Sequence, residues 1–294
     1  MGRLWKRHWT ANIAVSRTDI QLVILGYATG VIDALSVARL NVFSSNQTGN
    51  TVLLGVAIAG VKSDLVIVWS RNLVALLAFW FAVFVSGQLG HRIGTRKRWW
   101  LVSTHLVSSL ILYVAGILIY TGLVNISASQ NDLVFLTLTG VSYGIQAATV
   151  RPLNVPEIPT VVVTSAMVDL WSDKNLLKAH NVGRNRRVAF IAALFLGALS
   201  GAFLIKDADG HVVILAASVK LAVALSFMLN ADEPIKENGQ PLMAPAPLPA
   251  SPPKSTVPTL PATTPANHYA SPSVAALNPP PTSSIITARL STPK

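Results

Sequence analysis

Four ionisable residues lie within apolar segments of the sequence, where a charge is costly in a membrane and usually serves a function. Asp33 and Lys220 lie well inside the first and last of these segments, Asp169 lies in a shorter one, and Arg71 lies near the start of the third. Asp33 or Asp169 could pair with Lys220 and neutralise both charges, either as a proton relay or as a static bridge that fixes packing. We expect the long side chain of Arg71 to extend to the membrane surface.

A polar break from residue 44 to residue 50 brings hydroxyls, amides and a glycine into an otherwise apolar region. At membrane depth, non-helical backbone is tolerated only in a protein interior or around a wet cavity. A short helix that begins near Thr48 would direct its positive end into this break, which favours anions. The same side chains could instead only cap the helix, and both interpretations stay open. The candidate solute ligands here are Asp33, Asn46, Gln47, Thr48, Gly49 and Asn50.

A second break lies between residues 156 and 164, where prolines stop the preceding helix. Thr164 and Ser165 would begin the short helix that follows, and we add both to the candidate ligands. Two helix starts that face each other would make a site for an anion or a polar solute.

Eight apolar segments must position these residues. They fall at residues 20–40, 48–61, 65–90, 100–122, 133–150, 160–171, 188–205 and 211–229. The chain is 51% hydrophobic and 12% charged, about half the charge of a soluble domain, which excludes a soluble enzyme. A spanning helix needs about 20 apolar residues, so the second and sixth segments are too short. We predict an all-α integral membrane protein with six full spans and two short broken half-helices.

Basic residues form three clusters, at the N-terminus (residues 3–17), after the third segment (92–98) and after the sixth (174–187), whereas 123–132 has no Lys or Arg. If the two short segments do not cross, all three clusters lie on one side and 123–132 on the other, as the positive-inside rule requires. If all eight segments cross, the second cluster lies outside. We therefore predict cytosolic N- and C-termini. The net charge of +11 belongs to these loops and indicates no nucleic-acid partner.

Two halves of the chain, about 20–122 and 133–229, share a pattern. Each half reads as a span, a polar break, a short helix and two further spans, so the halves would have opposite orientations in the membrane. Paired short segments in inverted halves indicate a transporter binding site, although small residues four apart also mark ordinary helix packing. The matching elements are Gly26-x-x-x-Gly30 with Gly140-x-x-x-Gly144, and Arg39 to Val42 with Arg151 to Val155.

Motifs in both halves carry a resemblance to a known family. They are Gly30-Val31-Ile32-Asp33-Ala34, Phe43, Gln47-Thr48-Gly49-Asn50-Thr51-Val52-Leu53-Leu54-Gly55, and Gly144-Ile145-Gln146-Ala147-Ala148 with Arg151 and Thr164. In these residues the sequence resembles the YoaK-like membrane family, the domain of unknown function 1275, over about residues 20–229. The resemblance implies a multispan membrane protein with no assigned substrate, and Gln146 joins the candidate ligands. The second half has Thr164-Ser165 where the first has Thr-Gly, a departure from symmetry.

Three regions surround or follow the predicted site. Residues 1–18 form a basic cytosolic N-terminus, 19–230 the membrane domain, and 231–294 a Pro/Ala/Ser/Thr-rich tail that holds 15 of the 18 prolines. Such a tail cannot bury enough apolar surface to fold, so we predict that it is disordered and cytosolic. Asn125 begins a glycosylation sequon in the loop predicted outside. The sequon and the charge clusters suggest a plasma or vacuolar membrane.

The leading functional prediction is transport of a small polar or anionic solute, with proton coupling as one option, and not an enzymatic activity. One alternative is an intramembrane enzyme that uses Asp33, Asp169 and His105 as acid or base groups on an apolar substrate. The other is a membrane scaffold whose tail recruits partners. A lone histidine such as His105 is more typical of packing. We expect no cofactor and no metal site; the expected partners are the lipid bilayer and a small-molecule solute, with a homo-oligomer left open.

Overall fold

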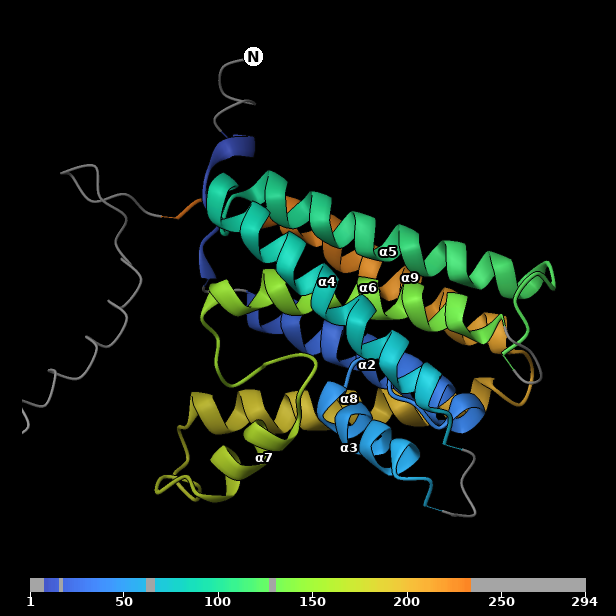
Figure 1. Cartoon of the computed structure of the whole chain (residues 1–294). Coiled ribbons are helices and arrows are strands. Elements are labelled where there is room, and N and C mark those ends of the chain that lie inside the picture. The colour runs from blue at the N-terminus through green and yellow to red at the C-terminus, as the bar shows by residue number, and fades with distance from the viewer. Residues whose placement is uncertain (1–7, 16–17, 62–66, 127–130, 234–294) are drawn as a thin grey trace, which may run out of the picture. The chain divides into compact units, whose positions relative to one another are not determined.

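The computed structural model describes residues 8–15, 18–61, 67–126 and 131–233 (Figure 1). By its contacts the chain divides into a unit Met1–Ala244 and a unit Pro245–Lys294, and the described residues all belong to the first. The predicted disordered tail from residue 234 onward, the arginines and lysine of the N-terminal cluster, and Ser127 of the sequon lie outside the described residues.

After a helical turn at residues 8–10, the described part of the chain contains six long helices, two short ones and no strand. The long helices are α2 (Thr18–Leu40), α4 (Trp69–Ile93), α5 (Arg98–Tyr120), α6 (Asp132–Val150), α8 (Val182–Leu204) and α9 (Asp209–Ser226); the short ones are α3 (Gln47–Ile58) and α7 (Thr164–Trp171). Single 3₁₀ turns extend α6 and α9 at Arg151–Leu153 and Phe227–Leu229. All six long helices are long and apolar enough to span a membrane, so the predicted all-α membrane fold is confirmed.

The start of α8 differs from the sequence prediction by six residues. The helix begins at Val182 rather than at residue 188, and so includes arginines that hydropathy assigns to the preceding loop. Asn181 caps it, because its Oδ1 accepts a hydrogen bond from the Arg184 backbone N–H at 2.8 Å. Arginine is also a good helix former. Hydropathy starts the segment only after the last arginine, whereas the cap and the helix propensity allow the helix to begin six residues earlier.

One end of the bundle, which we call the basic end, collects three segments that are distant in sequence. The N–H of Ile13 donates to the Arg96 carbonyl at 3.0 Å, and the N–H of Ala14 donates to the Ala231 carbonyl at 2.9 Å. The described N-terminal residues, the α4–α5 loop and the residues after α9 therefore meet at this end. Arg98, fully buried there, donates to the carbonyls of residues 8, 227 and 230.

The third basic cluster lies at the same end. Arg186 in the first turns of α8 has its Nε 3.5 Å from Asp19 Oδ2 at the start of α2. Residues 121–126 follow the far end of α5 and so lie at the opposite end of the bundle. Helices α3 and α7 have 12 and 8 residues, too few to span. The predicted separation between the basic loops and the uncharged loop is thus present in the fold.

Ion pairs tie helices together at the opposite end, and one of them involves Arg71. Its Nη2 lies 2.5 Å from Asp132 Oδ2 at the start of α6, and the carboxylate is almost fully buried. Arg71 therefore holds α4 against α6 where both helices begin. A second pair joins Arg39 at the end of α2 to Asp209 at the start of α9, at 2.9 Å.

The long helices pack in a definite order. Helix α2 packs along α8, α4 along α6 and α5 along α9, while α2 also contacts α9, and α6 contacts α5. Each short helix rests on the long helix that follows it, α3 on α4 and α7 on α8. Large apolar side chains such as Phe81 and Phe195 are about two-thirds exposed, as expected of surfaces that face lipid.

Two non-helical segments connect the long helices to the short ones: residues 41–46 join α2 to α3, and residues 154–163 join α6 and its 3₁₀ turn to α7. Asn41 and Asn154 start them in the left-handed conformation, with φ of 55° and 58°, which asparagine tolerates better than most residues. Val155 belongs to the apolar cluster toward the basic end, whereas Val161 belongs to the cluster that also contains Val42 and Leu40. The second segment therefore enters the bundle from the basic end before α7 turns back.

Candidate functional site

Asp33 anchors the first polar break inside the bundle. Its Oδ1 accepts hydrogen bonds from the backbone N–H groups of Ser44 and Ser45, both at 2.9 Å, and its Oδ2 accepts one from Ser45 Oγ at 2.5 Å. Ser44 Oγ in turn donates to Thr139 Oγ1 of α6 at 3.1 Å. Because Thr139 lies near the middle of α6, the chain is held close to mid-depth just before α3 begins.

The other polar residues of this break mostly bond to one another. Asn50 Oδ1 accepts from the Phe43 N–H at 2.9 Å, and its Nδ2 donates to the Phe43 carbonyl at 2.7 Å and to Gln47 Oε1 at 2.9 Å. Asn46 is the N-cap of α3 and accepts from the Gly49 N–H at 3.4 Å. These side chains shape and cap the break, so the capping interpretation describes them well in this conformation.

Lys220 of α9 is an ionisable residue of the bundle interior, and its side chain is fully buried. Its Nζ donates to Ser142 Oγ at 2.8 Å and lies 4.3 Å from the centre of the Tyr143 ring, a cation–π contact. Ser142 Oγ also lies 2.8 Å from Ser108 Oγ of α5. The ion pair that Lys220 could form with Asp33 or Asp169 is not present in this conformation, since within the described residues its hydrogen-bond partner is Ser142 and it has no carboxylate partner.

Two polar side chains near Lys220 have atoms without a protein partner. Gln146 of α6 donates from Nε2 to Thr29 Oγ1 of α2 at 3.2 Å, and His105 of α5 contacts Thr149 Oγ1 at 3.4 Å. Gln146 Oε1 and His105 Nδ1 are buried and have no hydrogen-bond partner among the described residues. Buried polar atoms without partners are rare in folded proteins and call for an explanation.

Helices α2, α5, α6 and α9 together supply this interior, which we call the polar interior. Its members are Thr29, Asp33, His105, Ser108, Thr139, Ser142, Tyr143, Gln146, Thr149 and Lys220. Asp33, Gln146 and Lys220 were candidates on sequence grounds, and His105 was expected to be a packing residue. The His105 ring does pack on Phe227, with ring centroids 5.1 Å apart. The hydroxyls were not predicted. Their spacing was a usable signal, because Ser142 and Gln146 are four apart on α6 and His105 and Ser108 are three apart on α5, so each pair lies on one face of its helix.

Four of the predicted candidates that lie outside the polar interior are exposed. Thr48 is exposed on α3, and Thr164, Ser165 and Asp169 are exposed on α7. The short helix α7 has eight residues, of which only Ala166 and Leu170 are buried. Its polar residues therefore point away from the bundle in this conformation, and the second break contributes less to the interior than the first.

Six helices of spanning length, around a buried polar interior and with two short helices that begin inside the bundle, define a multi-pass α-helical membrane protein. The family model described as "Protein of unknown function (DUF1275)" matches residues 21–226, and the chain belongs to this family. It is similar to the "UPF0700 transmembrane protein YoaK" of Bacillus subtilis (strain 168), with 29% identity over 163 residues that cover 54% of this chain and 68% of that protein. The resemblance seen in the sequence is thereby confirmed. No solved structure matches.

Proposed function

We propose that the chain transports a small polar solute, with an anion as the favoured class, through the polar interior. The observation that carries this proposal is the full burial of Lys220 without a carboxylate partner in the described residues. A buried lysine with no carboxylate partner in the described residues is costly to keep charged inside a membrane protein, and such residues usually serve a function. An anionic solute would supply the missing negative charge, His105 Nδ1 could donate a hydrogen bond to it when that nitrogen carries the proton, and Gln146 Oε1 could accept one from a hydroxyl of the solute.

Helix packing supports two inverted repeats as the frame for transport. Exchanging α2 with α6, α3 with α7, α4 with α8 and α5 with α9 turns each packing pair into another observed pair: α2–α8 becomes α6–α4, and α3–α4 becomes α7–α8. Asn41 and Asn154 end equivalent helices in the same left-handed conformation. Such repeats allow one half to rock against the other around a central site.

The alternatives have less support in the fold. The enzyme hypothesis needs Asp33, Asp169 and His105 together, but in the described residues no hydrogen bond or ion pair joins any two of them, and Asp169 is exposed. The scaffold hypothesis depends on residues outside the described part of the chain. Deleting residues 234–294 tests it directly, because a transporter would keep its uptake without the tail.

The arrangement of the basic and uncharged ends also supports a proposal for the orientation of the protein in its membrane. We propose that the basic end faces the cytosol, as the positive-inside rule predicts, with both termini there. Asn125 is exposed at the opposite end, where glycosylation in a eukaryotic plasma or vacuolar membrane would occur.

Replacing Lys220 with glutamine is expected to abolish most of the uptake. The full-length protein would be reconstituted in proteoliposomes and offered labelled phosphate, sulfate, formate, lactate and, as a neutral solute, glycerol. For the anion that the wild type takes up, we expect K220Q to lower the initial rate roughly 10- to 100-fold, the worth of one hydrogen bond to a charged group.

Lys206 provides the matched control. It is exposed after α8, with its Nζ 5.0 Å from the Phe203 ring, so K206Q removes the same charge outside the polar interior and should leave uptake unchanged. Uptake by K220Q at the wild-type rate would contradict the proposal, as would a wild type that carries glycerol but none of the anions.

A further inference from the structure

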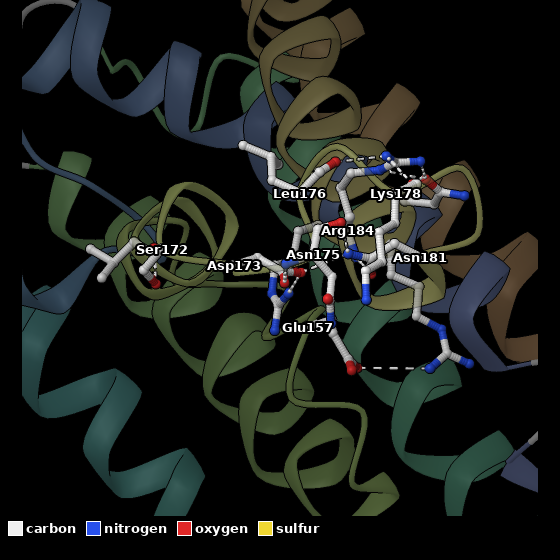
Figure 2. Close-up of polar contacts among 12 residues, drawn as sticks. Glu157, Ser172, Asp173, Asn175, Leu176, Lys178, Asn181 and Arg184 are labelled. Carbon is white, nitrogen blue, oxygen red and sulfur yellow. Dashed lines mark hydrogen bonds and ion pairs between the residues drawn. The ribbon is translucent and has the colours of Figure 1, made fainter.

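The connection between α7 and α8, residues 172–181, is closed around one arginine (Figure 2). Arg184 Nη1 donates to the carbonyls of Leu176 and Lys178 at 2.7 and 2.8 Å, and Nη2 donates to the Ala179 carbonyl at 3.5 Å. A guanidinium that binds three carbonyls of one turn fixes the path of that turn. We call residues 172–181 the α7–α8 loop.

An acidic residue inside the loop completes its frame. Asp173 Oδ2 accepts from Asn181 Nδ2 at 2.8 Å, and Oδ1 accepts from the Asn175 N–H at 2.8 Å. The hydrogen bond from Asn181 lowers the pKa of the Asp173 carboxyl, and its charge faces Arg187 Nη1 at 3.5 Å. The negative charge of the loop is thus used internally and does not offset the lysines on its surface.

The outer surface of the loop is apolar and cationic. Leu177 is 96% exposed between Lys174 and Lys178, which are also exposed and have no ion pair within the described residues. Trp171, where α7 ends, is 76% exposed. Because the hydrogen bonds from Arg184 fix the backbone on both sides of Leu177, the turn itself holds this side chain towards the outside.

The depth of the loop follows from α8. Its apolar run from Val188 to Leu204 has 17 residues, or about 25 Å of helix, slightly less than the hydrocarbon thickness of about 30 Å. The arginines that precede Val188 therefore lie where the acyl chains end and the headgroups begin. Since the α7–α8 loop is bonded to Arg184, it lies at the same level.

We propose that the α7–α8 loop is a binding site for anionic phospholipid headgroups at the basic end of the protein. Lys174 and Lys178 contact the lipid phosphates, and Leu177 and Trp171 insert at the boundary between headgroups and acyl chains, the preferred place of such side chains. Charge complementarity with an anionic leaflet selects this partner. The inference is independent of the transport proposal, because the loop lies outside the polar interior.

The chain contains no cysteine, so one introduced cysteine can carry a dye without background. Full-length A179C protein, which keeps Leu177, would be labelled and placed in nanodiscs of phosphatidylcholine and phosphatidylglycerol. Brominated chains on either lipid quench the dye, and the quenching ratio, corrected for mole fraction, measures local enrichment. We expect phosphatidylglycerol to be enriched, and K174Q together with K178Q to reduce the enrichment by roughly five-fold per lysine.

A dye on L123C is the matched control, because Leu123 is 64% exposed in the uncharged loop at the opposite end and both leaflets contain both lipids. It should show no preference. Equal quenching by the two lipids at position 179, or enrichment that persists in the double lysine variant, would overturn the proposal. Loss of enrichment on adding inorganic phosphate, but not sodium chloride of equal ionic strength, would also overturn it, since the loop would then bind the free anion.

Discussion

Replacing Gly30 with alanine is expected to prevent stable packing of α2 on α8. A Cβ at this position would lie 2.0 Å from the Leu194 carbonyl oxygen and 2.8 Å from the Ala198 nitrogen. Both atoms belong to the backbone of α8 and cannot rotate away, so the helices would have to separate. We expect a loss of roughly 3 kcal/mol or more in the free energy of unfolding, at the upper end of the usual cost of overpacking. Thermal unfolding in detergent, with the monodisperse fraction, measures it.

Two further glycines make this prediction specific. Gly144 has an equivalent place between α6 and α4, where a Cβ would lie 2.5 Å from the Phe79 carbonyl oxygen, and G144A should be similarly destabilised. Gly87 in α4 faces open space, so G87A should be neutral or gain up to about 1 kcal/mol from helix propensity. If G30A unfolded at the same temperature as G87A, the close approach of α2 and α8 would be wrong.

These glycines also show why so much of the fold could be predicted from the sequence. Bilayer thickness sets the length of a span, so hydropathy and length together separated six spanning helices from the two short ones. The Gly-x-x-x-Gly spacing at Gly26 and Gly140 marked the helix faces that approach most closely. Charge placed the basic loops at one end. Each of these signals is local in sequence or imposed by the membrane.

The polar interior was harder to predict because its contacts join helices that are distant in sequence. Lys220 bonds to Ser142, 78 positions earlier, and no local pattern favours that hydroxyl over the carboxylate of Asp33. The carboxylate of Asp33 is instead used by Ser44 and Ser45, only 11 and 12 positions later. Asp169 was misplaced for a related reason, since periodicity does not reveal that α7 exposes most of its surface.

The first break therefore has two roles that need to be separated, because Asp33 both anchors the chain and carries a charge. Replacing it with alanine is expected to release the start of α3. The N–H groups of Ser44 and Ser45 would lose their acceptor, at a cost of about 1–3 kcal/mol for each buried group left unpaired. Hydrogen–deuterium exchange over residues 43–51 should rise strongly in D33A and stay near wild type in a matched N72A variant, because the Asn72 amide donates to the carbonyl of Val68, the N-cap of α4, and not to the break.

Asparagine at the same position separates structure from charge. Its side-chain oxygen can accept both backbone N–H groups, and its amide can donate to the Ser45 hydroxyl, so exchange over residues 43–51 should stay low in D33N. If the carboxylate takes up and releases a proton during transport, D33N will lose the part of anion uptake that an imposed proton gradient drives, while uptake without a gradient remains. Gradient-driven uptake at the wild-type rate in D33N would show that Asp33 only anchors α3. Proton coupling would then require another group that can bind a proton. His105, whose Nδ1 is buried without a hydrogen-bond partner in the described residues, would be the next candidate.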